Sequence, residues 1–400
     1  MTRQVQLIMV TENNNNKFYN MIEEGSQIRI EYGRVGAAVR TCYKPLYKWD
    51  SIYREKTGKG YKDITALKSE VKITGYKDIE DTQVKYIVDF LISKAKQQIA
   101  NNYKVSYQQV TQAQISEAQA IVDRLAVISS STAIHTWTKQ FDSLLIELYT
   151  IIPRKMAHVQ EHLMRADSIY EDYKKKIAEE QELLDAMATQ VQQNRVLEEG
   201  DCDKTILEAT GINLVPASET DIETIKLKMG ANVGQFRKAW KVDNLRTLKD
   251  YQESYESVSS QSRKNELFWH GSRTENWWSI MSNGLMIRPS NAVYTGSMFG
   301  DGLYFANKAQ KSIGYTSLSS SYWARGNDNK AYLALYTVRV GKQYDIYSHT
   351  SECYSLNYRK IKDKGFDSVY AHSGKDLRND EFIIYNPAQC TIKYLVEIGK

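Results

Sequence analysis

The 400-residue chain has few of the residues or patterns that are typical of disulfide-rich, zinc-binding or membrane-spanning proteins. It contains five prolines and four cysteines. The cysteines lie far apart and form no C-x-x-C pair, so we expect neither a disulfide framework nor a zinc site, and a reducing compartment fits. No apolar run reaches the ~18–20 residues that a membrane span needs. The first residues show no basic region followed by an apolar stretch, so we expect no secretion signal.

Two common nucleotide-binding motifs are also missing. No G-x-G-x-x-G follows a strand pattern, and no G-x-x-x-x-G-K-[ST] occurs, so neither a Rossmann site nor a P-loop is expected. His158 and His162 are four residues apart, but they have no third ligand in a suitable frame, so we expect no metal. With 42% hydrophobic and 25% charged residues, the composition is that of an ordinary globular protein. The length suggests two to four domains.

Positive charge is concentrated at the start of the chain. The formal net charge is +5, and residues 1–80 carry 14 Lys or Arg against 10 Asp or Glu, a difference of +4. Aromatic residues are interspersed with these cations. This block suggests a polyanionic partner, although a solvated basic face explains the same pattern.

Hydrophobic periodicity divides the chain into three parts. Residues 5–10, 18–22 and 27–32 read as strands separated by turns, and a short helix is expected over residues 49–57. Apolar stripes with helical spacing then predict an all-α bundle between residues 80 and 210, including a long charged helix from about residue 155 to 194.

The last part mixes strands with short helices. Strands are expected at residues 266–269, 303–306, 332–340, 368–371, 381–385 and 391–398, and helices at 219–229 and 275–283. Gly284 is a candidate left-handed cap for the second helix, and Asn307 a candidate N-cap for a helix through Ser312. The pattern favours an α+β fold over a doubly wound sheet.

Three segments of this part stand out when they are taken together. They read F-W-H-G-S-R at 268–273, M-F-G-D-G-L-Y-F-A at 298–306 with K-S-I-G-Y at 311–315, and N-D-E-F-I-I-Y at 379–385. Each alone has an ordinary explanation, such as a turn or a strand edge. In this order and spacing, residues 215–400 resemble the catalytic domain of the poly(ADP-ribose) polymerase family, with His270, Tyr304 and Glu381 as its H-Y-E signature.

The resemblance implies an NAD⁺ ADP-ribosyltransferase of α+β fold with a split antiparallel sheet, which uses NAD⁺ as a substrate and no metal. Glu381 would bond the nicotinamide-side ribose and orient the acceptor hydroxyl. His270 would bond the adenine-side ribose, and Lys311 would lie near the acceptor. The other cofactor-binding residues implied by the resemblance are Gly271 and Ser312 at the carboxamide, Tyr304 and Tyr315 on either side of the ring, and Ser272 and Arg288.

Two positions depart from the family pattern. The arginine expected two residues after Gly284 falls on Met286, with Arg288 two residues further on, and the tyrosine expected before Met298 is Ser297. Both departures concern contacts on the adenine side of NAD⁺.

The resemblance extends upstream. Residues 32–36, Y-G-R-V-G, after N-K-F-Y at 16–19 are similar to a WGR domain, with Tyr32 in place of the Trp. The bundle is similar to the autoinhibitory helical domain of the same family. We therefore expect a WGR-like DNA-binding domain at 1–78, a helical regulatory domain at 79–212 and the transferase domain at 213–400. Tyr32 and Arg34 would contact the end of a broken DNA.

These expectations describe a poly(ADP-ribose) polymerase that is activated by DNA breaks, modifies itself and other proteins, and serves the DNA damage response. A mono-ADP-ribosyltransferase of the same fold, and a catalytically silent scaffold that binds DNA or poly(ADP-ribose), are the alternatives. A third is that residues 1–80 only dock another protein. We expect no membrane partner, and a nuclear location if the source is eukaryotic or otherwise an intracellular one.

Overall fold

The structure is a computed structural model that describes residues 3–35, 37–65, 76–103, 110–129, 134–198, 203–258, 265–287, 298–319 and 321–400. It divides into two compact units, Met1–Ile73 with Gln97–Glu198, and Thr74–Lys96 with Glu199–Lys400. These units do not divide at residues 78/79 and 212/213, and the three predicted domains remain a proposal. Arg288 and Ser297, and Gly36 of the Y-G-R-V-G segment, lie outside the described ranges.

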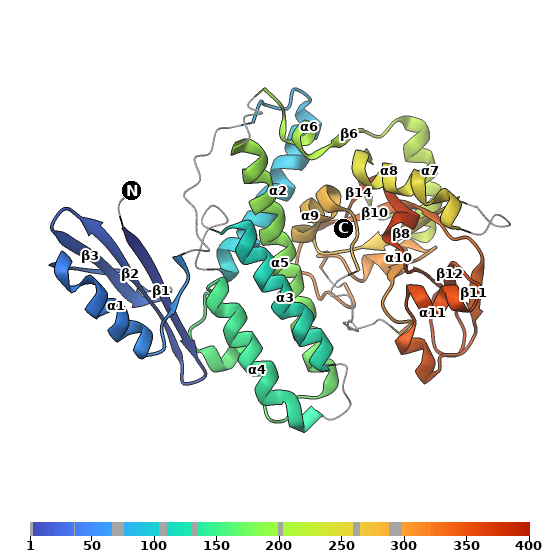
Figure 1. Cartoon of the computed structure of the whole chain (residues 1–400). Helices are drawn as coiled ribbons and strands as arrows, with labels where there is room; N and C mark the ends of the chain where they lie inside the picture. The colour runs from blue at the N-terminus through green and yellow to red at the C-terminus, as the bar shows by residue number, and fades with distance from the viewer. Residues whose placement is uncertain are drawn as a thin grey trace. The chain divides into compact units, whose positions relative to one another are not determined.

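The first unit begins with an antiparallel sheet in the order β4-β3-β2-β1-β5 (Figure 1). Its strands are β1 (Gln4–Thr11), β2 (Asn15–Glu24), β3 (Gln27–Arg34), β4 (Arg40–Pro45) and β5 (Lys62–Asp63). The three predicted strands and the helix α1 (Trp49–Gly58) are confirmed. Trp49 of α1 is 2% exposed and packs against Met21, Ile28 and Ile30 of the sheet, so burial of this ring anchors the helix.

The helices of the first unit include α3 (Gln112–Ser129), α4 (Ile134–Ile151) and α5 (Tyr170–Glu198). Arg154 and Glu180 form a buried ion pair of 2.6 Å, and the same carboxylate also accepts hydrogen bonds from Lys176 Nζ and Tyr149 Oη. Removing one member of such a network leaves a buried charge without its partner, which is strongly destabilising.

The predicted start of the long helix at residue 155 is wrong, because α5 begins at Tyr170. Two side chains bond the preceding segment, which contains a short 3₁₀ helix (Val159–His162) and no α-helix. Asp142 Oδ1 accepts the Met164 backbone N–H at 3.0 Å, and Asp172 Oδ2 accepts that of Ile169 at 2.9 Å. These bonds satisfy backbone donors that a continuous helix would have paired internally.

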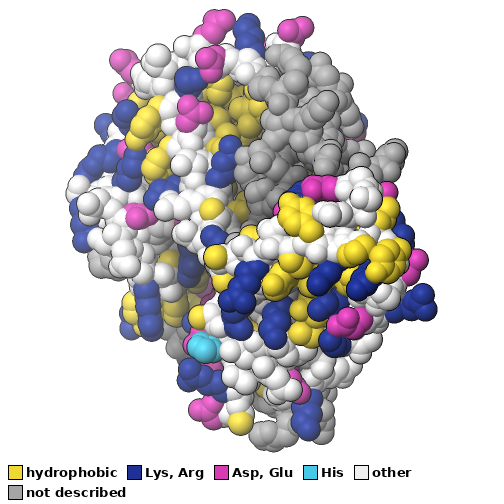
Figure 2. Space-filling model, turned by 90° about the vertical axis from the view of Figure 1, so that its left-hand side faces the viewer, with side chains coloured by type: hydrophobic (Ala, Val, Ile, Leu, Met, Phe, Trp, Pro, Cys, Tyr) yellow, Lys and Arg dark blue, Asp and Glu magenta, His cyan; other side chains and the backbone are white. Residues whose placement is uncertain are grey.

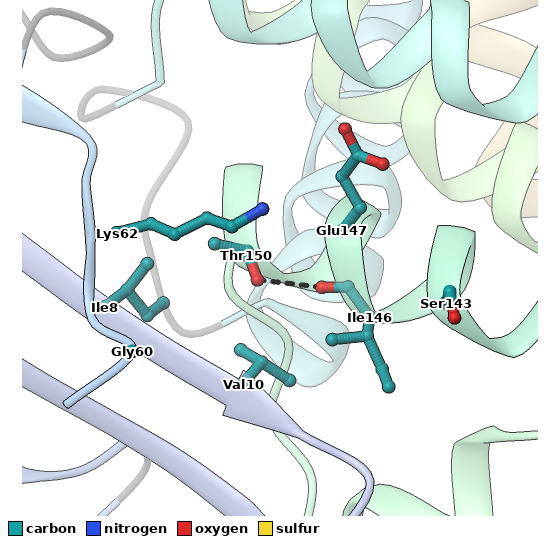
Figure 3. Close-up of a pocket in the computed structure, with 8 residues that line it drawn as sticks. All are labelled: Ile8, Val10, Gly60, Lys62, Ser143, Ile146, Glu147 and Thr150. Carbon is teal, nitrogen blue, oxygen red and sulfur yellow. Dashed lines mark hydrogen bonds between the residues drawn. The ribbon is translucent and has the colours of Figure 1, made fainter. Parts of the chain in front are cut away.

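A cavity of about 260 Å³ lies between the N-terminal sheet and α4 (Figure 3). Ile8, Val10 and Ile146 supply apolar side chains, and Lys62 and Glu147 supply opposite charges. The remaining lining residues are Gly60, Ser143 and Thr150. The sheet and this helix are therefore in contact without being packed to the density of a closed core.

The second unit contains two sheets. The larger has the order β6-β7-β14-β10-β8 and the smaller β11-β12-β13-β9. All their strand pairs are antiparallel except β11 with β12. The bounds are β6 (Ile212–Pro216), β7 (Phe236–Asn244), β8 (Asn265–Gly271), β9 (Leu303–Phe305), β10 (Lys330–Arg339), β11 (Gln343–Ile346), β12 (Ser368–Ala371), β13 (Glu381–Ile384) and β14 (Cys390–Gly399). The predicted mixture of helices and antiparallel sheets is confirmed.

Short helices surround these sheets, namely α6 (Ile206–Thr210), α7 (Glu219–Met229), α8 (Leu245–Glu253), α9 (Trp277–Asn283), α10 (Ala309–Ile313) and α11 (Tyr358–Asp363). The first half of α2 (Thr82–Asn102) also belongs to this unit. Its residues Val84, Ile87 and Leu91 are buried in one core with Trp240 and Trp277. A fragment that begins at residue 213 would therefore lose part of the apolar core beside the transferase sheets.

Two predicted helix caps are different in the structure. Gly284 follows α9 with a φ of 75°, but its ψ of 177° is extended, so it is not a left-handed cap. Asn307 does not cap α10, whose N-cap position is Lys308. The Asn307 side chain instead donates to Asp380 Oδ2 at 3.1 Å.

Within the described ranges, no helix is long and apolar enough to cross a membrane. The same residues contain no group of three or more His, Cys, Asp or Glu side chains arranged to hold a metal ion.

Candidate active site

The predicted site residues come together where the two sheets of the second unit meet. Trp269 of β8 and Ala306 after β9 exchange backbone hydrogen bonds of 2.8 and 3.0 Å, which join the larger sheet to the smaller. β9 in turn pairs with β13, where Tyr304 is opposite Ile383. The strands that carry His270, Tyr304 and Glu381 are thus consecutive neighbours.

His270 is held beside Tyr304. Its Nδ1 atom lies 3.0 Å from the carbonyl oxygen of Tyr304, and its ring contacts those of Trp277, Phe305 and Tyr336 at centroid distances of 5.8 to 6.4 Å. Burial lowers the pKa of His270, and the bond to the Tyr304 carbonyl opposes this shift. The imidazole is therefore favoured in its neutral form, which suits a hydrogen-bonding and positioning role.

Gly271 is in direct contact with α10. A Cβ atom at this position would lie 1.9 Å from the Ser312 carbonyl oxygen and 2.7 Å from its carbonyl carbon. Only glycine allows the end of β8 to approach the helix so closely. The Ser312 side chain is 4% exposed. Ser272, the next predicted residue, accepts a hydrogen bond of 3.2 Å from Asn276 Nδ2.

Tyr304 is fixed by its hydroxyl group. The hydroxyl donates to the Gly300 carbonyl at 2.8 Å and accepts the Phe299 backbone N–H at 3.0 Å. Burial raises its pKa well above the ordinary value for tyrosine, so it stays protonated near neutral pH. The F-G-D-G-L-Y segment therefore folds back on its own tyrosine and holds the ring in place.

Tyr315 follows α10 and is 36% exposed. Its ring is nearly parallel to that of Trp323, with an angle of 18° and a centroid distance of 6.1 Å. Trp323 is a neighbour that the sequence motif did not indicate, because it comes from the loop after the helix.

Lys311 Nζ is in contact with Glu381 Oε1. Glu381 is 7% exposed and begins β13, and Lys311 lies on α10. Burial lowers the pKa of Lys311 to about 8, while Asp380 opposes the shift. The pair places a carboxylate and its counter-charge at one end of β13. Its two members are 70 residues apart in the chain.

Asp380 is a member of the site that sequence reasoning missed. Its carboxylate accepts hydrogen bonds from Asn307 Nδ2 at 3.1 Å, Tyr370 Oη at 3.2 Å and the Ser373 backbone N–H at 2.8 Å. Burial raises the pKa of Asp380, but these bonds outweigh burial and bring it below the ordinary value. The residue before Glu381 is thereby tied to three separate segments. The N-D-E order was visible in the sequence, but its partners were not.

Asp301 is the partly buried carboxylate of the F-G-D-G segment. Burial raises its pKa to about 6, with Lys360 opposing the shift, and its Oδ1 atom has no hydrogen-bond partner among the residues described. A pKa that is higher in the folded than in the unfolded chain favours folding at low pH. That contribution is lost as the pH rises from about 4 to about 6.

We therefore expect Asp301→Asn to raise the free energy of unfolding at pH 7 by about 1–2 kcal/mol, after allowance for partial exposure. Thermal melts of both proteins should nearly coincide at pH 4 and separate as the pH rises to 7. Asp363→Asn is the matched control, because that side chain is 70% exposed on α11. A variant that melts below the wild type at pH 7 would contradict the expectation.

The two predicted DNA-binding residues lie in the first unit. Tyr32 is half-buried beside Tyr19, with ring centroids 6.0 Å apart. Arg34 donates to the backbone oxygen of Asn14 at 2.9 Å, to its side-chain oxygen at 2.7 Å, and to the Ala157 carbonyl. Its guanidinium therefore joins the turn between β1 and β2 to the segment after α4.

Comparison with known proteins agrees with this geometry. The model of the poly(ADP-ribose) polymerase catalytic domain matches residues 221–399. The putative poly [ADP-ribose] polymerase-like protein 100L of Invertebrate iridescent virus 6 is 34% identical over 171 residues, which are 42% of this chain and 89% of that protein. The uncharacterized protein 101L of the same virus is 34% identical over 190 residues, 47% of this chain and 78% of that protein.

A longer match reaches the N-terminal unit. Poly [ADP-ribose] polymerase 2-A of Oryza sativa subsp. japonica is 24% identical over 399 residues, which cover 90% of this chain and 57% of that protein. The match to the catalytic domain and the similarity to these relatives define an ADP-ribosyltransferase that uses NAD⁺ as its substrate. The chain belongs to the poly(ADP-ribose) polymerase family.

Proposed function

We propose that this site breaks the bond between nicotinamide and ribose in NAD⁺ and transfers the ADP-ribosyl group to protein acceptors. The leaving nicotinamide is already cationic, and positive charge develops on the ribose as the bond breaks, as in glycoside chemistry. The protein must hold the dinucleotide in one orientation and place negative charge beside the developing cation.

The described contacts support a division of roles. Gly271 would bond the carboxamide through its backbone, and Ser312, whose carbonyl touches Gly271, would add its hydroxyl. Tyr304 and Tyr315 would stack on the nicotinamide. His270 would bond the adenine-side ribose in its neutral form. Ser272 and Arg288 remain proposed cofactor contacts without a described role.

Glu381 would accept a hydrogen bond from the nicotinamide-side ribose, stabilise the charge that develops there, and orient the attacking acceptor hydroxyl. Lys311, which contacts this carboxylate, would hold it in place and lie on the acceptor side. The observation that carries the proposal is this buried pair at the end of the strand next to Tyr304. Its test, the Glu381→Gln variant, opens the Discussion.

We further propose that the product is poly(ADP-ribose) and that the chain modifies itself as well as other proteins. The names of several relatives support this. Labelled NAD⁺ should yield a ladder of products on a denaturing gel, together with label on the enzyme. A single discrete product would favour the mono-ADP-ribosyltransferase, and no release of nicotinamide would favour the silent scaffold.

We propose that a WGR-like domain at 1–78 and a regulatory helical domain at 79–212 make the activity depend on DNA breaks. Figure 2, which views the molecule from the left-hand side of Figure 1, shows Lys and Arg side chains among hydrophobic ones. Exposed Tyr43 and Tyr47 are each followed directly by a lysine, Lys44 and Lys48. Cations next to open rings suit phosphates and terminal bases.

In this proposal Arg34 has a second role besides a DNA contact, because its guanidinium already bonds Asn14 and Ala157. DNA that engaged Tyr32 and Arg34 would have to exchange these bonds. That exchange would change how the sheet is held to the segment after α4, and could shift the local unfolding of the helices. A role in the DNA damage response and a nuclear location belong to the same proposal.

The test is the rate of ADP-ribosylation by the full chain with and without nicked or blunt duplex DNA. We expect DNA to raise the rate, and the stimulation to weaken as salt increases. The double variant Tyr47→Ala with Lys48→Ala should need more DNA for half-maximal stimulation and keep the DNA-free rate. Lys249→Ala is the matched control, since its side chain is 73% exposed on α8. Equal rates with and without DNA would refute the proposal.

A further inference from the structure

Five aromatic rings form a continuous stack through the smaller sheet of the second unit. It starts at Tyr347, after β11, and ends at Phe268 on β8. Successive centroid distances are 4.1 Å, 3.8 Å, 4.6 Å and 4.0 Å, and every interplanar angle is below 30°. In order, the rings are those of Tyr347, His372, Tyr370, Phe382 and Phe268.

The outer ring of this stack presents an open face. Tyr347 is 69% exposed, although its ring lies against His372 at an angle of only 10°. One face is therefore covered and the other is available. Exposed aromatic rings that are held rigidly by a stack are suited to bind another flat ring at little entropic cost.

Hydrogen bonds fix the covered side of the ring. His372 Nε2 lies 2.7 Å from Asp345 Oδ1, and the His372 backbone N–H donates to the Ile346 carbonyl at 2.9 Å. The next ring, Tyr370, donates its hydroxyl to Asp380. The ring face at Tyr347 is thus preorganised. Through the Tyr370 hydroxyl, the stack is also linked to Asp380, the residue next to Glu381.

The strand register defines where this face lies. Ile346 pairs with Ala371, and Ala371 pairs with Glu381, so Tyr347 and His372 lie at the same end of the sheet as Glu381. Tyr370 pairs with Phe382. Because side chains alternate along a strand, the stack and Glu381 are on opposite faces of the sheet. Tyr347, which follows β11, is two strand spacings from Glu381 on β13, roughly 10 Å. The open ring face is therefore distinct from the reaction site.

Two cations lie in the loop that connects this platform to Glu381. Lys375 and Arg378 are exposed within residues 372–380. The loop is tied down at several points, since the Ser373 backbone N–H donates to Asp380 Oδ1 and that of Gly374 to the Leu377 carbonyl. The nearby carboxylate of Asp376 accepts the His349 backbone N–H at 2.7 Å.

A small cavity of about 150 Å³ adjoins the ring of Tyr347. It is below the ~300–1,000 Å³ of pockets that enclose a whole ligand, so it fits one ring or part of one. Its polar lining, Asp345, Ser348 and Thr350 among others, offers acceptors for an amino group. An open aromatic face, acceptors for an amine and two exposed cations together match an adenine ring that carries phosphates.

We propose that this platform, defined by Tyr347, His372, Lys375 and Arg378, is a second nucleotide-binding site that holds an ADP-ribosyl group of the growing product. The adenine would stack on Tyr347, and the pyrophosphate would bind Lys375 and Arg378. One open ring and two cations suit a single unit better than a nucleic-acid strand, which needs a track of several rings and charges. The inference rests on the proposed formation of a polymer.

The test is amide hydrogen exchange of the full chain with and without ADP-ribose, which reports each segment separately. We expect protection of residues 345–349 and 372–378, in addition to any protection of the donor segments around Gly271 and Tyr304. For Tyr347→Ala, the ADP-ribose concentration that gives half-maximal protection of residues 345–349 and 372–378 should rise about tenfold. Tyr347→Phe, which keeps the ring, should leave this concentration unchanged. Arg378→Ala should raise it, whereas Arg359→Ala, with a side chain 90% exposed on α11, should not.

Two further measurements separate the possible outcomes. Tyr347→Ala should shorten the product ladder and leave the initial release of nicotinamide unchanged. If nicotinamide is never released, the proposed activity fails while binding of ADP-ribose can still be scored. The inference is overturned if ADP-ribose protects only the donor segments, if Tyr347→Ala leaves the protection of 372–378 intact, or if an oligothymidylate protects these residues and ADP-ribose does not.

Discussion

Replacing Glu381 with Gln is expected to lower the rate of nicotinamide release from NAD⁺ by ~10²–10³-fold, the cost of removing one preorganised electrostatic contact to a transition state. Gln retains the size of the side chain and removes its negative charge. That charge matters most as the ribose becomes cationic, so kcat should fall far more than the apparent affinity for NAD⁺.

The change also removes the ionic partner of Lys311. Thermal melting must therefore accompany the kinetics, because a buried cation without its partner lowers stability. Glu253→Gln is the matched control, since that carboxylate is 65% exposed on α8 in the same unit. A Glu381→Gln protein that is folded and releases nicotinamide at the wild-type rate would exclude Glu381 as the catalytic carboxylate.

Gly271→Ala is expected to have the second-largest effect. Its Cβ would lie 1.9 Å from the Ser312 carbonyl oxygen, and backbone atoms cannot rotate away as a flexible side chain can. The end of β8 and α10 must therefore separate, which moves Ser312 and Lys311 away from their positions beside Gly271 and Glu381. A misplacement of about 1 Å costs ~10²-fold in rate, and the overpacking should cost about 1–3 kcal/mol of stability.

Gly234→Ala provides the comparison for this variant. Gly234 lies in the same unit, and no heavy atom is within 4 Å of the position its Cβ would take. Nicotinamide release and thermal melting should be measured for both proteins. If Gly271→Ala retains full activity and Gly234→Ala does too, the close contact between β8 and α10 is not required for the reaction.

Short-range patterns in the sequence predicted most of the secondary structure. The alternation in residues 27–32 and the apolar spacing in α3 and α4 gave correct elements because one face of each is buried. The predicted start of the long helix was wrong because Asp142 bonds the Met164 backbone N–H from 22 residues earlier in the chain, and Asp172 bonds that of Ile169 three residues before it. The first of these bonds depends on the tertiary fold and leaves no periodic signal.

The candidate site was predictable to the extent that it follows ordered motifs. His270, Tyr304 and Glu381 could be named because their segments resemble a known family, whereas the contact of Lys311 with Glu381 requires α10 to meet β13. Asn307 was assigned to a helix cap from its neighbours, but its partner Asp380 lies 73 residues away. The ring stack behind Tyr370 was missed for the same reason, since its members come from separate strands.

The most direct measurement is the transfer of label from NAD⁺ that is labelled in its adenylate half to protein, with the released nicotinamide counted in the same reaction. We expect the wild-type chain to attach label to protein and to release at least one nicotinamide for each ADP-ribosyl group that it attaches. NAD⁺ that is bound by the folded chain without either product would contradict the assignment of these convergent residues to ADP-ribosyl transfer.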